Sequence, residues 1–351
     1  MQQKNKAFRI WTAVVAASLL AFPLAGACTQ PTYEANASQT QTVIVSGQPF
    51  GIKLFTDGVV VVGTADIPSS GGAVNPARQA DIQIGDLITA VNDTPISSNN
   101  AIAQAVEQSG GKAVSLTLQR SGKTIQAKLQ PVASAGGWRA GLWVRDSAAG
   151  VGTLTFYDPQ TGMFGGLGHG VTDPDTTDLV PFGSGDIVPV SIHGYQKGTS
   201  GTPGELRGYF TSDTPVGTLM ANVGEGVYGS MQTDPGGKRM AVCPAEQVKP
   251  GKAQVLCTID GTEPETYDAE IVLVDTRSTQ SRNLVLRITD QRLLDKTGGI
   301  VQGMSGSPIL QNGQLVGAIT HVFVNDPTRG YGILAAHMLS TETQLAQKRA
   351  G

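Results

Sequence analysis

The stretch GGIVQGMSGSPILQNGQLVGAITH, from Gly298 to His321, holds a Gly-x-Ser-Gly-x-Pro core between two apolar runs. A serine hydroxyl is a poor nucleophile at neutral pH and needs a base beside it. It also needs hydrogen-bond donors aimed at the oxyanion that forms when it attacks a carbonyl. Glycines around Ser305 let the backbone turn tightly and gather its N–H groups in one place. Two interpretations follow: Ser305 is a nucleophile, or the stretch is only a turn between two strands.

Four histidines are candidates for the base. His169 lies in the glycine-rich segment MFGGLGHGVTDPD, which favours an exposed loop over a core. His193 stands at the end of a strand-like run and is the second candidate, whereas His337 falls in the terminal helical stretch, where we expect a structural role. His321 follows Ser305 by 16 residues, on the next strand. In chymotrypsin-like folds that strand walls the substrate pocket, so we expect His321 to contact substrate.

The third member of such a site is a carboxylate that holds the imidazole in one tautomer. Asp290 directly ends the strand-like run NLVLRIT and is therefore better fixed in space than Asp295. Weaker alternatives are Asp173, Asp175 and Asp275. Spacing alone leaves this choice open. By analogy with trypsin-like proteases, the N–H groups of Gly303 and Ser305 would form the oxyanion hole.

The composition indicates a mainly β protein. The 351 residues include 45 glycines and 19 prolines, which is typical of many short strands joined by tight turns. Residues 133–351 repeat short apolar runs between turns, which favours a barrel or a sandwich. The net charge of −3 argues against a general nucleic-acid binder. We expect no cofactor and no metal, because the chain has no Walker loop, no G-x-G-x-x-G after a strand and no H-E-x-x-H.

The N-terminus resembles an export signal. Three basic residues precede an apolar run over residues 10–26, and Ala25-Gly26-Ala27 offers a cleavage site just before Cys28. A cleaved signal or a retained membrane anchor in residues 1–28 ranks above a lipidated Cys28, and each places the rest of the chain outside the cytoplasm. Residues 29–46 are polar and predict a flexible linker. The other two cysteines, Cys243 and Cys257, either form a cross-strand disulfide or stay buried and unpaired.

Residues 47–132 resemble a bacterial-type PDZ domain. The similarity rests on the order of elements and on NPARQADIQIGDLITAVNDTPI, followed by a helix that Asn99 or Asn100 would cap and by a strand hairpin. In that family a short loop presents backbone N–H groups to a peptide carboxylate, and the peptide adds a strand to the sheet. The resemblance would place this loop at Phe50, Gly51 and Ile52, with Lys53 adding positive charge. The alternative is that these residues only close a small β domain.

Nearly the whole chain resembles the stage IV sporulation protein B peptidases, which are PDZ-containing serine proteases of spore-forming bacteria. The resemblance rests on TDQRLLDKTGGIVQGMSGSPILQNGQLVGAITHVFVNDPTRGYGI, with GLGHGVTDPDT upstream and the PDZ-like region before both. It implies a triad of His169 as base, Asp290 as its orienting acid and Ser305 as nucleophile. It also implies a chymotrypsin-like double β-barrel over residues 133–351. The acid lies only 15 residues before the serine, much closer than in trypsin-like enzymes.

The resemblance further implies partners and a location. Such proteins are exported into the space between the forespore and mother-cell membranes, where they cleave themselves. They also cleave a membrane-bound inhibitor of an intramembrane metalloprotease, which leads to activation of a late sigma factor. We expect self-cleavage in residues 29–46, because accessible polar segments are cut first. The alternatives are a general quality-control protease and a non-catalytic PDZ protein that binds peptides.

Overall fold

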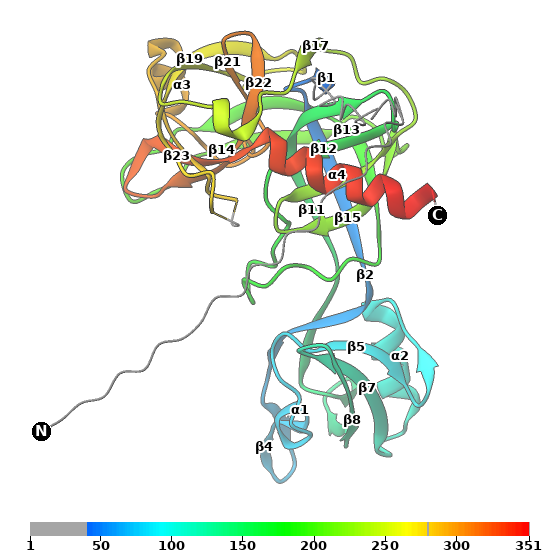
Figure 1. Cartoon of the computed structure of the whole chain (residues 1–351). Helices are drawn as coiled ribbons and strands as arrows, with labels where there is room; N and C mark the ends of the chain where they lie inside the picture. The colour runs from blue at the N-terminus through cyan, green and yellow to red at the C-terminus, as the bar shows by residue number, and fades with distance from the viewer. Residues whose placement is uncertain (1–40, 279–280, 351) are drawn as a thin grey trace, which may run out of the picture. The chain divides into compact units, whose positions relative to one another are not determined.

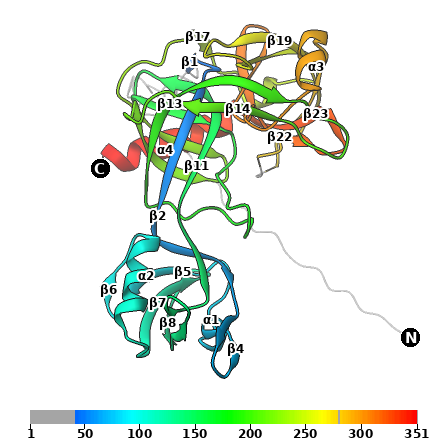
Figure 2. The same cartoon turned by 180° about the vertical axis from the view of Figure 1, so that it is seen from behind.

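The computed structural model describes residues 41–278 and 281–350. The expected export segment 1–28, including Cys28, and most of the expected linker lie outside the described residues. The described chain is mainly β, as expected. Its strands build two barrels and a smaller sheet, which Figure 1 and Figure 2 show from opposite sides. Across these two ranges, no helix has both the length and the apolar character needed to cross a membrane.

Six strands close the first barrel, because each pairs with the next in an antiparallel ladder and the last returns to the first. In ring order they are β2 (Pro49–Thr64), β11 (Leu142–Asp158), β12 (Met163–Gly166), β16 (Gly226–Met231), β15 (Gly217–Val223) and β13 (Ser184–Gln196). Strands β1 (Thr42–Val45), β17 (Lys238–Ala241) and β14 (Glu205–Phe210) attach through β11 and β13. Phe50, Leu54 and Phe164 are buried inside. Each such side chain contributes about 1.5–3 kcal/mol relative to exposure.

The second barrel is closed by six more strands. In ring order these are β18 (Gly251–Cys257), β19 (Glu265–Val274), β20 (Leu284–Ile288), β23 (Asp326–Leu334), β22 (Gln314–Phe323) and β21 (Pro308–Gln311). Alternation decides which side chains enter the core: in β20, Leu284, Leu286 and Ile288 are buried and Arg287 is exposed. Cys243 and Cys257 are buried against this core and unpaired. The 3-10 turn η1 (Ala245–Gln247) precedes β18, and helices α3 (Gln291–Thr297) and α4 (Ala335–Ala350) follow β20 and β23.

The smaller sheet belongs to the region that resembles a PDZ domain. The outer half of β2 pairs with β5 (Leu87–Val91), followed by β7 (Val114–Arg120) and β8 (Lys123–Leu129), with β6 (Thr94–Pro95) beside β5. Helix α2 (Asn99–Gln108) buries Ile102 and Val106. Ser98 caps α2 by accepting a hydrogen bond from the Ala101 N–H, so the expected cap at Asn99 or Asn100 is wrong by one residue. Short elements complete the region: α1 (Pro76–Gln79), β3 (Ile67–Ser69), β4 (Gly72–Val74), β9 (Val132–Ser134) and β10 (Gly137–Arg139).

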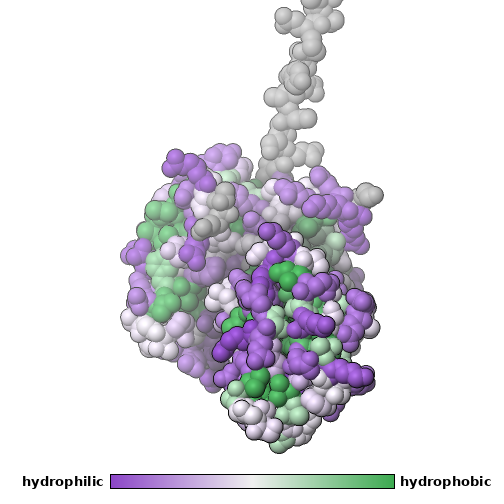
Figure 3. All heavy atoms as spheres, turned by 90° about the horizontal axis from the view of Figure 1, so that it is seen from below, coloured by the Kyte–Doolittle hydropathy of each residue, from purple (hydrophilic) through white to green (hydrophobic). Residues whose placement is uncertain are grey.

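The domain boundaries differ from those expected. Residues 42–45, expected in the linker, form β1 and pair with β11 and β17. Residues 50–53, expected in the PDZ domain, lie in the barrel half of β2 between β11 and β13. The first barrel therefore begins before the PDZ-like region. The chain leaves the barrel along β2, forms the PDZ-like region, and returns to the barrel along β11. On the face shown in Figure 3, hydrophilic side chains separate smaller hydrophobic groups.

Candidate active site

The turn that carries Ser305 joins α3 to β21. Gly303 and Gly306 both have positive φ, +94° and +93°, a region that side chains rarely adopt. The Met304 side chain is fully buried in the core of the second barrel and so fixes the turn to that barrel. The Ser307 N–H donates to the Met304 carbonyl at 2.9 Å, which tightens it. The glycines at these positions are therefore required by the backbone, as the sequence suggested.

The first barrel holds this turn in place through β11. The Thr153 N–H donates to the Ser305 carbonyl at 2.9 Å, and the Thr155 hydroxyl donates to the Gly306 carbonyl at 2.7 Å. A Cβ atom at Gly306 would lie 2.0 Å from the Thr153 carbonyl oxygen, closer than any real contact. The turn that carries Ser305 thus packs directly on the first barrel, and only glycine fits at position 306.

Two backbone donors beside Ser305 are unused. Among the residues that the structure describes, neither the Gly303 N–H nor the Ser305 N–H makes an intramolecular hydrogen bond. Both residues line a cleft of about 460 Å³ whose walls come from the two barrels. Partly exposed N–H groups that face a cleft can donate to an oxyanion formed there. Both expected donors therefore lie at the cleft wall, and the oxyanion hole at Gly303 and Ser305 stays a prediction.

His169 faces the same cleft from the first barrel. It follows β12 after a tight turn in which Leu167 and Gly168 take positive φ, +62° and +69°. Its Nδ1 lies 2.8 Å from the Gly170 carbonyl oxygen. A carbonyl can only accept, so Nδ1 carries the proton and Nε2 keeps a free lone pair. Burial lowers the pKa of His169 below its ordinary value of 6.5, which keeps the ring neutral and able to accept a proton.

Ser305 and His169 line one cleft without a hydrogen bond between them among the described residues. The Ser305 hydroxyl instead donates to the Thr320 carbonyl at 2.8 Å. A serine Oγ changes direction by rotation about one bond, and catalytic hydrogen bonds often form only when substrate is present. Both residues thus line the same cleft, and their roles as nucleophile and base stay predictions.

Asp290, the expected acid, is placed elsewhere. It is the N-cap of α3 and accepts from the Arg292 N–H at 2.9 Å. The same carboxylate forms an ion pair with the Arg292 guanidinium at 2.8 Å and accepts from the Asp268 N–H at 3.2 Å. The pKa of Asp290 is lowered, first by its hydrogen bond with Arg292. Asp290 neither lines the cleft nor contacts His169 in the described chain, so this structure does not assemble the expected triad.

The other candidate residues have structural surroundings. His193 is exposed beside Tyr209, and His337 on α4 contacts Asn283 at 3.1 Å, as expected for a structural residue. The four alternative acids all lie outside the cleft. Arg145 pairs with Asp173 and Asp175, the Arg277 N–H donates to Asp275, and the Gln291 amide donates to Asp295.

His321 also lines the cleft, on β22. Its ring packs on His169, with centroids 4.7 Å apart and planes tilted by 35°. The sequence placed His321 on the correct strand but did not predict this contact, because the two residues lie 152 positions apart in different barrels.

The expected carboxylate loop of the PDZ region is not formed by residues 50–53. Phe50 and Ile52 are buried in the first barrel, and their strand pairs on both sides, so its backbone groups are occupied. Lys53 instead pairs with Asp213 at 2.6 Å. The interpretation of these residues as a peptide-binding loop is therefore wrong.

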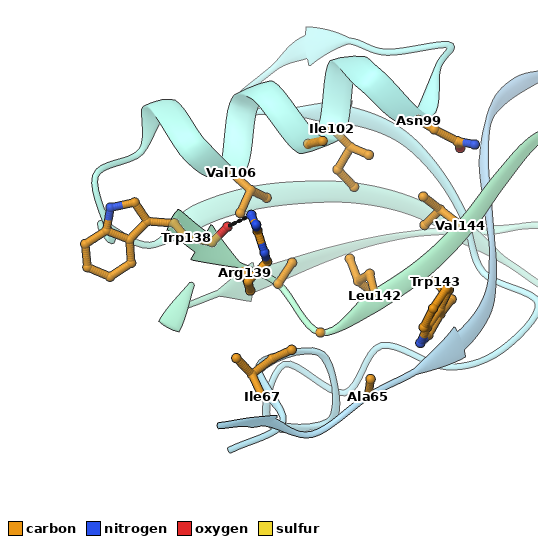
Figure 4. Close-up of a pocket in the computed structure, with 13 residues that line it drawn as sticks. Ala65, Ile67, Asn99, Ile102, Val106, Trp138, Arg139, Leu142, Trp143 and Val144 are labelled. Carbon is orange, nitrogen blue, oxygen red and sulfur yellow. Dashed lines mark hydrogen bonds between the residues drawn. The ribbon is translucent and has the colours of Figure 1, made fainter. Parts of the chain in front are cut away.

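A second cleft of about 410 Å³ lies in the PDZ-like region (Figure 4). Helix α2 lines one side with Asn99, Ile102 and Val106, and residues 138–144 line another. Gly141 takes a positive φ of +66° just before β11. Leu142 and Val144 follow Gly141 in the chain and line the same cleft as helix α2 (Figure 4).

Two family models match parts of the chain. The family model for SpoIVB peptidase S55 matches residues 136–339, and the PDZ domain model matches residues 73–120. No curated protein matches the chain.

Two solved structures are similar over parts of the chain. The active form of the Rv3671c protease from M. tuberculosis is 15% identical, over 57% of this chain and 74% of that one, with a TM-score of 0.35. The PDZ domain of an SdrC-like protein from Listeria monocytogenes is 24% identical, over 25% of this chain and 87% of that one, with a TM-score of 0.21. The S55 match spans more than half of the sequence and includes His169 and Ser305. The chain therefore belongs to the SpoIVB peptidase S55 family and is a PDZ-containing serine protease.

Proposed function

We propose that Ser305 is the nucleophile of an endopeptidase and His169 its general base. The observation that carries this proposal is one cleft in which Ser305, two unused N–H donors and a histidine with a free Nε2 meet. His169 Nε2 takes the Ser305 hydroxyl proton while Oγ bonds to the substrate carbonyl carbon. The Gly303 and Ser305 N–H groups then hold the oxyanion.

His169 next gives its proton to the leaving amine, and the peptide bond breaks to leave an acyl-enzyme. Water then loses a proton to His169 and attacks the ester carbonyl. The bond between that carbon and Ser305 Oγ breaks, His169 returns its proton to Oγ, and the carboxylic acid product leaves. The Gly170 carbonyl accepts the Nδ1–H throughout and holds the tautomer, a task that the expected triad gave to Asp290.

The first test follows self-cleavage of the full chain by intact mass and labelling of the serine by a fluorophosphonate probe. Wild type should shorten and take up the label, whereas Ser305→Ala should do neither. Ser307→Ala is the matched control, because the Ser307 hydroxyl is fully buried without a hydrogen-bond partner among the described residues. Equal shortening of wild type and Ser305→Ala would contradict the assignment of Ser305.

The role of Asp290 needs a separate variant. Asp290→Asn keeps a good helix cap but loses the ion pair with Arg292, so the free energy of unfolding should fall by no more than about 1 kcal/mol. In the arrangement described, His169 keeps the Gly170 carbonyl as its partner in this variant, which should keep its activity. A fall in kcat of about 10⁴-fold in the folded variant would instead show that Asp290 reaches His169 in a rearranged state, as the family resemblance implies.

We also propose that the PDZ-like cleft beside α2 binds the C-terminal end of a peptide. It has the apolar lining and the neighbouring strand that such a ligand uses, with the turn at Gly141 in place of residues 50–53. Ala103 is exposed on α2 and lines the cleft, so Ala103→Glu should block a peptide with a free carboxylate. Gln104→Glu adds the same charge outside this cleft and serves as control. Equal affinity of both variants in fluorescence anisotropy would contradict this site.

The biological setting is proposed from the family. We propose export across the cytoplasmic membrane, self-cleavage, and cleavage of a membrane-bound inhibitor of an intramembrane metalloprotease during sporulation. A cut before Thr42 would leave β1 paired and both barrels whole. N-terminal sequencing of the mature chain tests this placement, and a new end beyond Val45 would contradict it.

A further inference from the structure

His321 stands where β22 departs from regular pairing. Ile319 pairs with Gly332 and His321 with Tyr331, so one extra residue, Thr320, is inserted in β22. Bulges of this kind redirect the side chains next to them and are frequent near active sites. The inserted residue also supplies the carbonyl that accepts from Ser305. The bulge therefore sets the direction of His321 and the resting position of the nucleophile together.

The His321 imidazole stays uncharged at neutral pH. Burial, then the charges of His169 and Arg282, lower its pKa to about 4. Tyr331 lies opposite it on β23, with the Arg282 guanidinium over the Tyr331 ring. His321 Nδ1 is buried and has no hydrogen-bond partner among the described residues. One ring nitrogen is therefore shielded, and one face of the ring packs on His169.

We propose that His321 is a positioning residue for His169: its neutral ring packs on the catalytic imidazole and holds it toward Ser305. This inference rests on the proposed function. The Gly170 carbonyl fixes one edge of the His169 ring, and His321 restricts tilting of its face. His321 also covers that face of the His169 ring, and burial of the ring lowers the His169 pKa. His321 itself exchanges no proton.

Three variants of the full chain separate packing from chemistry. His321→Phe keeps an uncharged ring, His321→Ala removes it, and His193→Ala removes an exposed histidine as control. We expect His321→Ala to lower kcat by about 100-fold with little change in KM, because a misplaced base costs that much. His321→Phe should keep most of the activity, and His193→Ala all of it.

The pH profile gives a readout that general damage to the fold would not move. Activity is lost as pH falls through the His169 pKa, which burial lowers. In His321→Ala water reaches the ring, so the pKa should rise toward 6.5 and the acidic limb should move to higher pH. In His321→Phe the limb should stay. An NMR titration of His169 follows the same pKa in each variant without depending on turnover.

Several results would overturn the inference. A His321→Phe variant as slow as His321→Ala would show that the imidazole nitrogens matter. A change in KM alone in His321→Ala would show that His321 contacts the substrate and does not position His169. An unchanged His169 pKa in His321→Ala would show that the ring does not shield the base. If His321→Ala does not fold, His321→Gln replaces it, with the same expected shift of the His169 pKa. If the fluorophosphonate probe did not label Ser305 in wild type, the proposed function itself would be overturned.

Discussion

Replacing Gly306 with alanine should disable the site by a clash that can be estimated from the structure. The new Cβ would meet the Thr153 carbonyl oxygen at 2.0 Å and the Leu167 nitrogen at 2.6 Å. Real contacts begin near 3.0 Å, so the turn and β11 must separate by about 1 Å. The φ of +93° adds backbone strain of about 1–3 kcal/mol.

The separation also breaks hydrogen bonds. The Thr155 hydroxyl is buried and donates to the Gly306 carbonyl at 2.7 Å, and leaving it unpaired costs about 1–3 kcal/mol. Together with the strain, Gly306→Ala should lower the free energy of unfolding by about 2–6 kcal/mol. A displacement of about 1 Å at the neighbouring Ser305 should reduce kcat by about 100-fold.

The assay is denaturant unfolding together with fluorophosphonate labelling of Ser305. Gly313→Ala is the matched control: Gly313 has a φ of +75°, but nothing lies within 4 Å of its added Cβ. The control therefore carries backbone strain without the clash. If Gly306→Ala were no less stable than Gly313→Ala and labelled at the wild-type rate, the proposed packing of the turn on β11 would be refuted.

Three further predictions concern stability. Asp290→Ala should lower the free energy of unfolding by about 1 kcal/mol in denaturant titrations, because α3 loses its N-cap. The contribution of neutral His321 to the free energy of unfolding should be fully present above pH 6.5 and be lost as pH falls toward about 4, because the folded pKa of His321 is about 4 and the unfolded chain takes up the proton first. Unfolding midpoints measured across this window should fall less in His321→Phe than in wild type. Arg120→Leu should cost about 3–5 kcal/mol, measured by the same titrations, because the Asp86 carboxylate, 1% exposed and 2.7 Å from Arg120 Nε, loses its partner.

The turn at Ser305 and the loop at His169 could be predicted from the sequence, because both depend on local backbone properties. The glycines around Ser305 have the positive φ values that their spacing suggested, and the neighbouring N–H groups are unused in the described chain. His169 was identified by its glycine-rich setting, which lets the chain turn sharply at the end of β12. These properties depend on a few consecutive residues and on backbone sterics.

Contacts between distant segments were not readable in this way. Asp290 ends a strand beside the nucleophile segment, yet its neighbours Arg292 and Asp268 take up its carboxylate. Residues 50–53 have the pattern of a PDZ loop, but strand pairing with β11 and β13 places them in the barrel. Pairing between distant strands placed residues 50–53, whereas Asp290 is held mainly by Arg292, two residues further on, and also by the Asp268 N–H on β19.

By itself the sequence determined a mainly β chain, the tight turn at Ser305 and the glycine-rich loop that carries His169, because alternation and backbone freedom are local properties. Only the tertiary structure decided that the PDZ-like region is inserted between β2 and β11, and that His321 packs on His169. Those features depend on the closure of two barrels from strands far apart in the chain. The free energy of that closure comes from burying whole faces of side chains, and no single segment carries it.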